Sequence, residues 1–260
     1  MFAKSSRFLL PIILPAVLIG ILFGVRASAH ADDARPDGTM PPAGANDWTC
    51  RPSAAHPQPV VLVHGTWGNQ NSWDVLAPQL KAQGYCVFSL SYGRAISSIR
   101  GAQPGVYGTA DMRRSAREIA GFVDDVRAAT GAPKVDIVAH SQGGPLVRHF
   151  LRFEGGANEG NPADNKVDHL VTIAATNHGT TAAGLGFLLP TGSAQGPILG
   201  LIASYLGASA PQQLIDSEFM RSLNAGAIPN PASSTRLSPA ASTGSSPRPR
   251  PPFSPPESGQ

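Results

Sequence analysis

The sequence holds little charge and few cysteines, and each shortage excludes a class of protein. Only 14% of the 260 residues are charged, against 42% hydrophobic residues, so the chain as a whole is not disordered. The net charge is only +3, and the arginines are scattered rather than interleaved with aromatic side chains, so no nucleic-acid partner is expected. Two cysteines cannot by themselves build a tetrahedral metal site, and no histidine pair lies near either one at ligand spacing.

A long uncharged and apolar stretch lies at the N-terminus. Residues 8–25 carry no charge, Lys4 and Arg7 precede them, and the small residues at 27, 29 and 31 offer two cleavage sites. This pattern predicts that residues 1–31 are a signal peptide and that the protein is secreted. The alternative is an uncleaved membrane anchor, because a stretch of this length reaches the lower limit for spanning a bilayer. We expect no membrane contact apart from this segment.

Export would place the two cysteines in an oxidising compartment, so we expect a disulfide between Cys50 and Cys86. Two free buried thiols are the alternative. In the chain-entropy view a loop of this size contributes about 3–4 kcal/mol of stability.

Composition divides the rest of the chain into three parts. Residues 32–58 are polar and Pro-rich and form a linker or an arm, whereas residues 59–225 alternate strand-like and helix-like segments. Continuous apolar runs predict buried parallel strands at 59–63, 86–90, 135–139 and 167–175. Helical spacing predicts helices near 73–80, from a cap at Asp111 to Gly131, and over 144–153. This order predicts an α/β protein with a mostly parallel sheet and helices on both faces.

Residues 226–260 form a Pro/Ser-rich tail in which no apolar periodicity is found. We expect this tail to be disordered, because it cannot bury enough surface to offset its chain entropy. The apolar edge of the fourth strand would then be unpaired.

A candidate nucleophile follows the third predicted strand. Residues 139–144 (AHSQGG) place Ser141 on a tight strand-to-helix turn, which exposes the hydroxyl above the sheet edge. Plain turn chemistry is the alternative. The following helix directs its unpaired amides toward the same point.

The first strand ends in a second informative motif, residues 63–68 (VHGTWG). Acyl transfer builds negative charge on a carbonyl oxygen, and two backbone donors must hold that charge. The N–H groups of Thr66 and Gln142 would converge there. We interpret His64 as a side chain that braces the loop.

These motifs together resemble a known family. Residues 58–225 are similar to the small secreted bacterial lipases of the α/β-hydrolase fold, in particular the class 2 group of triacylglycerol lipases. The resemblance rests on residues 63–66 (VHGT), 84–88 (GYCVF), 139–144 and 176–180 (TNHGT). It implies hydrolysis of a lipid or ester substrate such as an acylglycerol, with Ser141 as nucleophile, Thr66 and Gln142 as oxyanion donors, and no cofactor. The apolar residues 197–206 would border the acyl site, although they are equally typical of a core helix.

The resemblance stops abruptly near residue 226, which implies that the C-terminal strands are missing and that the chain is truncated or shifted in reading frame. The catalytic triad is accordingly incomplete in the sequence. In this fold an Asp or Glu and then a His should follow the serine. Two of the histidines after Ser141, His149 and His169, lie within predicted elements, whereas His178 follows the fourth strand. The resembled family has a histidine in the same segment and does not use it as the base, so His178 is a weak candidate. The carboxylates without a convincing place in a triad are Asp164, Asp168, Asp216 and Glu218.

Two other functions therefore stay open beside a secreted esterase. The chain could be a truncated, catalytically inactive hydrolase domain. It could also be a non-enzymatic protein that binds the cell envelope through its tail.

Overall fold

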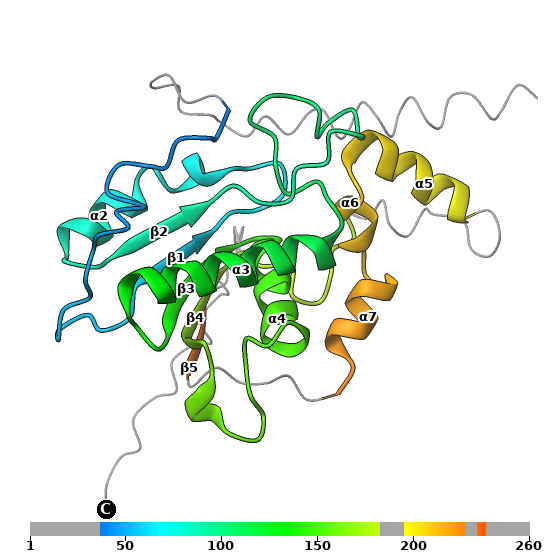
Figure 1. Cartoon of the computed structure of the whole chain (residues 1–260). Coiled ribbons are helices and arrows are strands. Elements are labelled where there is room, and N and C mark those ends of the chain that lie inside the picture. The colour runs from blue at the N-terminus through cyan, green and yellow to red at the C-terminus, as the bar shows by residue number, and fades with distance from the viewer. Residues whose placement is uncertain (1–36, 183–194, 227–232, 238–260) are drawn as a thin grey trace, which may run out of the picture.

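The computed structural model describes residues 37–182, 195–226 and 233–237, and these residues form a single parallel sheet with its helices (Figure 1). The strand order is β2-β1-β3-β4-β5, and every neighbouring pair is parallel. The strands are β1 Val60–Val63, β2 Val87–Leu90, β3 Val135–His140, β4 Val167–Ile173 and β5 Ser233–Leu237. The mostly parallel sheet and its first four strands were predicted and are confirmed.

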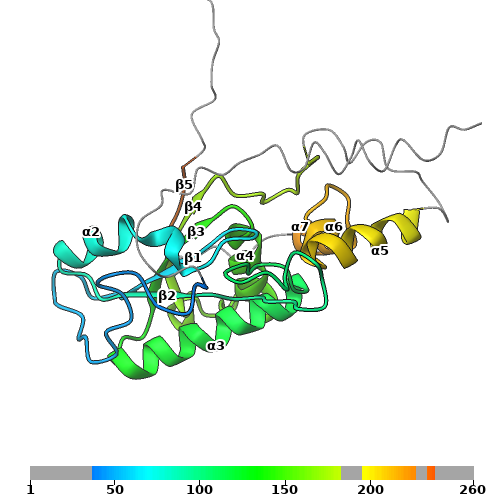
Figure 2. The same ribbon diagram turned by 90° about the horizontal axis from the view of Figure 1, so that it is seen from above.

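Helices cover both faces of the sheet (Figure 2). Alternate strand residues such as Val61 and Ile137 share a core with α3, α4 and α7, whereas Leu62 packs with η1 and α2 on the opposite face. Burial on both faces explains the continuous apolar run of β1, whose four residues are all buried. The helices are η1 Gln70–Trp73, α2 Leu76–Ala82, α3 Met112–Thr130, α4 Gly143–Phe153, η2 Pro162–Asp164, α5 Gln195–Leu206, α6 Ser209–Gln212 and α7 Glu218–Asn224.

The longest helix, α3, begins and ends as its sequence predicts. The carboxylate of Asp111 accepts hydrogen bonds from the N–H groups of Arg113 and Arg114, which satisfies two donors of the first turn. Gly131 closes the helix at φ 73°, a left-handed conformation that favours glycine.

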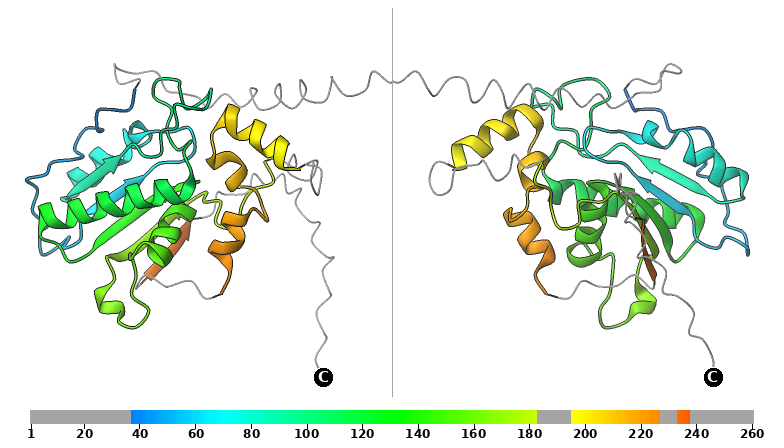
Figure 3. Two further views of the ribbon diagram at one scale, coloured as in Figure 1. Left: turned by 45° about the vertical axis from the view of Figure 1, so that its right-hand side comes forward. Right: turned by 180° about the vertical axis from the view of Figure 1, so that it is seen from behind.

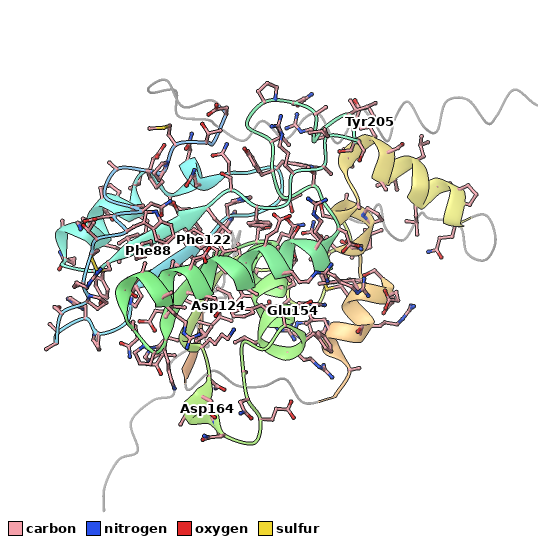
Figure 4. All side chains as sticks on the ribbon, in the orientation of Figure 1. Phe88, Phe122, Asp124, Glu154, Asp164 and Tyr205 are labelled. Atoms are coloured by element: carbon pink, nitrogen blue, oxygen red, sulfur yellow. A yellow bond between two sulfur atoms is a disulfide. The ribbon has the colours of Figure 1, made fainter. Side chains whose placement is uncertain are left out.

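Residues 37–58 form a packed arm rather than a free linker. The side-chain amide of Asn46 donates to the carbonyl of Ser89 at 2.9 Å and accepts from its N–H at 2.7 Å, so it pairs with β2 as a strand would. The ring of Trp48 lies 5.1 Å from that of Phe88 and 5.7 Å from that of Phe122, between centroids. Trp48 thus packs between β2 and α3, whose residues Phe88 and Phe122 are labelled in Figure 4.

The arm is tied to the sheet by a disulfide. Cys50 and Cys86 are bonded, with their Cα atoms 5.8 Å apart, and the described residues contain no free cysteine. The predicted pairing is therefore confirmed, and the alternative of two free thiols is wrong.

The C-terminal edge of the sheet differs from the sequence expectation. Residues 233–237 form β5, which pairs with β4 from His169↔Ser233 to Ile173↔Leu237. The expectation that the sheet ends at the fourth strand, and that the tail is disordered, is wrong for these five residues. Strand pairing uses backbone N–H and C=O groups, so a segment with no apolar periodicity can still cover an exposed edge.

The predicted signal peptide and the remainder of the tail lie outside the described residues. Within the described ranges, none of the helices combines the length and the apolar character needed to cross a bilayer.

We expect a Cys50→Ser/Cys86→Ser double variant to lose about 3–4 kcal/mol of unfolding free energy, because the disulfide closes a loop with a sequence separation of 36. Urea unfolding followed by fluorescence measures this loss. Reduced wild-type protein is the matched control and should unfold at the midpoint of the double variant. A double variant as stable as oxidised wild-type protein would contradict the prediction.

Candidate active site

The turn between β3 and α4 holds Ser141 in an unusual backbone conformation. Ser141 has φ 51°, in the left-handed region that residues with a side chain rarely adopt. Its N–H donates to the carbonyl of Ile173 on β4 at 2.9 Å, and its carbonyl accepts from the N–H of Gly144 at 3.1 Å. The sequence-predicted sharp turn is thus present and is held from both sides.

The end of β1 lies directly against this turn. A Cβ atom on Gly65 would come within 2.9 Å of Nδ1 of His140 and 3.0 Å of Cβ of Ser141. A Cβ atom on Gly143 would lie 2.8 Å from the carbonyl oxygen of Val63. Glycine is favoured at both positions, because a Cβ atom on Gly65 would strike side chains of the serine turn and one on Gly143 would strike the backbone of β1. The two motifs that the sequence analysis expected to converge therefore do lie together.

The backbone amides of Thr66 and Gln142 are available as donors. Neither N–H makes a hydrogen bond within the part of the chain that the structure describes. Gln142 is the N-cap residue of α4, and its side chain does not cap the helix. The positive end of the helix dipole therefore faces the Ser141 turn without an internal partner.

The loop after β1 is supported by a neutral histidine. His64 is fully buried, and its Nε2 accepts a hydrogen bond from the N–H of Tyr92 at 3.2 Å. Since an amide can only donate, Nδ1 carries the proton and donates to the carbonyl of Gly65 at 2.8 Å. Burial lowers the pKa of His64 to about 4. These contacts agree with the bracing role expected for this side chain.

His178 is not hydrogen-bonded to the serine. It is exposed in the loop after β4, and its side chain forms no hydrogen bond with Ser141 or with any other described residue. The other two histidines that follow Ser141 in the sequence have structural contacts. His149 is buried in α4 and stacks on Phe219, and Nδ1 of His169 lies 2.8 Å from a carboxylate oxygen of Asp136.

The four carboxylates considered for the triad are placed away from Ser141 or bound elsewhere. Asp164 and Asp168 lie at the amino end of β4, and Figure 4 shows Asp164 at the opposite end of the molecule from Tyr205 of α5. Glu218 forms an ion pair with Arg113, and Asp216 is exposed between α6 and α7. Among the described residues, therefore, no histidine–carboxylate pair stands beside the serine.

One group of side chains in the described ranges has donors that could hold a metal ion. The ligand atoms of Asp136, Asp168 and His169 lie within 4.8 Å of one another. The imidazole is already hydrogen-bonded to Asp136, and the ammonium of Lys134 lies 3.9 Å from Asp168. These side chains form a polar network at the end of β3 and β4 opposite Ser141.

The apolar segment 197–206 belongs to α5 and is not a core helix. No side chain of α5 is buried, and Leu201 is 65% exposed. The indole N–H of Trp67 donates to the carbonyl of Leu206 at 3.2 Å, which ties the end of α5 to the loop of Thr66. The position of α5 at an acyl site stays a prediction.

Sequence reasoning missed the residues that back this loop. The side chain of Gln213 contacts the hydroxyl of Thr66, and Gly108 packs against Thr66 and Gln142. Neither residue belongs to a motif, and Gln213 lies 147 positions from its partner, so the sequence offered no local signal.

Comparison with known proteins identifies a matching family. The family model described as Lipase (class 2) matches residues 57–235, which is more than half of the chain and reaches into β5.

Solved structures are also similar to the chain, at low identity. Phospholipase PlaB from Legionella pneumophila is 21% identical, with a TM-score of 0.46 over 70% of this chain and 38% of that one. The mature lipase BlEst2 from Bacillus licheniformis is 19% identical, with a TM-score of 0.45 over 76% of this chain and 68% of that one. The chain thus spans well under half the length of PlaB. Together with the observed sheet, the family match confirms the predicted α/β-hydrolase fold.

We expect the stability of the protein to fall in weak acid because of His64. Its pKa is about 4 in the folded chain and about 6.5 when unfolded, so the unfolded chain binds the proton first. The stabilisation that the neutral His64 ring provides is complete above about pH 6.5 and is lost as the pH falls toward 4. The free energy of unfolding should fall by about 3 kcal/mol over this range.

Urea unfolding at several pH values tests this expectation, with His64→Gln as the variant and His56→Gln as the control. The control should keep the acid sensitivity, and His64→Gln should lose much of it. An NMR titration in which the His64 ring protonates near pH 6.5 would contradict the account.

Proposed function

The chain belongs to the class 2 lipase family and is therefore a lipase- or esterase-type hydrolase; within that class, we propose that it cleaves carboxylic esters, in particular acylglycerols, with Ser141 as the nucleophile. The observation that carries the proposal is the left-handed turn of Ser141, held against the loop of Thr66 at the carboxyl edge of the sheet. This geometry supports attack by the hydroxyl on an ester carbonyl lying above the edge.

The two free amides supply what the reaction then needs. When the hydroxyl oxygen bonds to the carbonyl carbon, the carbonyl oxygen becomes negatively charged. The N–H groups of Thr66 and Gln142 are fixed before the substrate arrives, so they can stabilise that charge with little reorganisation. We propose them as the oxyanion donors.

Turnover further requires a base that takes the proton of the Ser141 hydroxyl. Of the histidines after Ser141 that the structure describes, His178 is the one that follows the carboxyl end of a strand, the edge that carries the serine. A rotation of its exposed side chain toward Ser141 would be needed before it could act.

A second function is favoured by the absence of a histidine–carboxylate pair beside Ser141 in the described ranges. A hydrolase domain with a nucleophile and an oxyanion site but without a base would be acylated slowly and would not turn over. The cell-envelope binding alternative has no observation in its favour.

We propose that the protein is secreted after cleavage near Asp32, on the basis of the N-terminal pattern alone. The intact mass of the exported protein decides between cleavage and an uncleaved anchor.

A fluorophosphonate probe should label the chain at Ser141, because the turn exposes this hydroxyl beside the two amides. Peptide mass mapping locates the adduct. Ser141→Ala should abolish labelling, whereas Ser204→Ala, which removes an exposed serine on α5, should leave it unchanged. Unchanged labelling in Ser141→Ala would refute the proposed nucleophile.

Hydrolysis of p-nitrophenyl butyrate then separates the two functions. Steady turnover that His178→Ala lowers by about a hundredfold or more supports the esterase with His178 as base. A single burst without turnover supports the inactive domain. Turnover that persists in Ser141→Ala would contradict both.

A further inference from the structure

Gln213, at the end of α6, is in contact with the loop that carries the proposed oxyanion donor Thr66. We propose that Gln213 is a positioning residue, which holds the N–H of Thr66 at the distance from Ser141 that the reaction needs. The inference rests on the proposed function and adds to it a residue that belongs to none of the sequence motifs.

The side chains of Thr66 and Gln213 are hydrogen-bonded to each other. The hydroxyl oxygen of Thr66 lies 3.1 Å from Oε1 and 3.0 Å from Nε2 of Gln213. Gln213 is buried, and its Nε2 also reaches the carbonyl of Ser209 at 3.3 Å. A buried amide without these partners would cost about 1–3 kcal/mol, so the side chain is confined to this orientation.

The backbone of Gln213 is itself anchored to the loop after β4. Its carbonyl accepts from the N–H of Thr180 at 2.8 Å, and the N–H of Ile215 donates to the carbonyl of Thr180 at 3.1 Å. Thr180 follows β4 in the same loop as His178. Gln213 therefore joins the loop after β1 to the loop after β4, across the carboxyl edge that holds the serine.

The start of α6 supports the other oxyanion donor. The buried hydroxyl of Ser209 donates to the carbonyl of Gly108 at 2.7 Å. A Cβ atom on Gly108 would lie 2.8 Å from Oε1 of Gln142 and 3.3 Å from Cα of Thr66. Figure 3 shows α6 between α5 and α7 at this end of the molecule. The one short helix thus backs both donor residues.

The loop of Thr66 needs such support because its own backbone is strained. Trp67 has φ 59°, and the N–H of Gly68 closes the turn onto the carbonyl of Gly65 at 3.2 Å. A donor acts on the oxyanion only at about 2.7–3.1 Å, and a shift of about 1 Å can cost a hundredfold in rate. Loss of the Gln213 contact should therefore slow reaction at Ser141 while the fold remains intact.

The test measures the second-order rate constant for fluorophosphonate labelling of the 260-residue chain. Gln213→Ala should lower it roughly 10- to 100-fold. Thr66→Val removes the hydroxyl but keeps the backbone amide, and it should lower the rate to a similar extent. Because both changes break one contact, the double variant should be no slower than the slower single variant.

The matched control is the neighbouring glutamine. Gln212 is held at the start of α3, where Oε1 accepts from the N–H of Met112 at 2.7 Å and Nε2 donates to Asp111 at 2.6 Å. Gln212→Ala should label at the wild-type rate. Additive effects of Gln213→Ala and Thr66→Val would overturn the inference, as a general loss of stability would produce them.

A second measurement keeps this inference separate from the proposed function. Amide hydrogen exchange at Gly68, whose N–H closes the turn of this loop onto the carbonyl of Gly65, should accelerate in Gln213→Ala and not in Gln212→Ala. Wild-type protein that is never labelled would refute the nucleophile, and exchange alone would then decide whether Gln213 holds the loop. Unchanged exchange at the Gly68 amide in Gln213→Ala would overturn the inference whatever the labelling shows.

Discussion

The close approach of two backbones at the carboxyl edge of the sheet is the constraint on which the rest of the site depends. Gly65 and Gly143 lack the Cβ atoms that would strike Ser141 and the end of β1, so the serine turn and the Thr66 loop can touch. The left-handed conformation of Ser141 costs about 1–3 kcal/mol. The buried parallel strands on both sides of β3 hold the turn in place and offset this cost.

Around this contact, buried polar groups fix the loops that enclose the serine. His64 stays neutral and joins Gly65 to Tyr92, whose hydroxyl donates to the carbonyl of His64 at 2.7 Å. On the other side, the buried guanidinium of Arg148 in α4 donates to the carbonyl of Asn177 and, at 2.8 Å, to the side chain of Asn224. The nucleophile helix, the loop after β4 and α7 are therefore cross-linked. Such a network suits a site whose donors must be fixed before the substrate binds.

Local sequence patterns predicted the parts of the fold that local forces decide. The apolar run of β1, the cap at Asp111 and the closing Gly131 all appear where expected, because burial and capping act on neighbouring residues. The serine turn was predictable for the same reason, since the small residues around Ser141 permit it. The disulfide followed from the cysteine count and the signal-like N-terminus.

The parts of the fold and of the site that the sequence did not predict depend on contacts between residues far apart in the chain. These residues belong to no recognisable sequence pattern. Asn46 pairs with β2 through its side chain, and β5 pairs with β4 through its backbone, so neither needed an apolar sequence. In the sequence Gln213 is an ordinary polar residue, and only the folded chain brings its side chain into contact with Thr66. A base for Ser141 was not found in the sequence, and among the described residues no histidine side chain is hydrogen-bonded to the serine.

The central claim is that Ser141 attacks an ester whose carbonyl oxygen is held by the amides of Thr66 and Gln142. A crystal structure of the phosphonylated protein tests this claim most directly, since the adduct imitates the tetrahedral intermediate. The account predicts phosphorus bonded to Oγ of Ser141, with the phosphoryl oxygen about 2.7–3.1 Å from both backbone nitrogens. An adduct on another residue, or a phosphoryl oxygen that contacts neither amide, would contradict it.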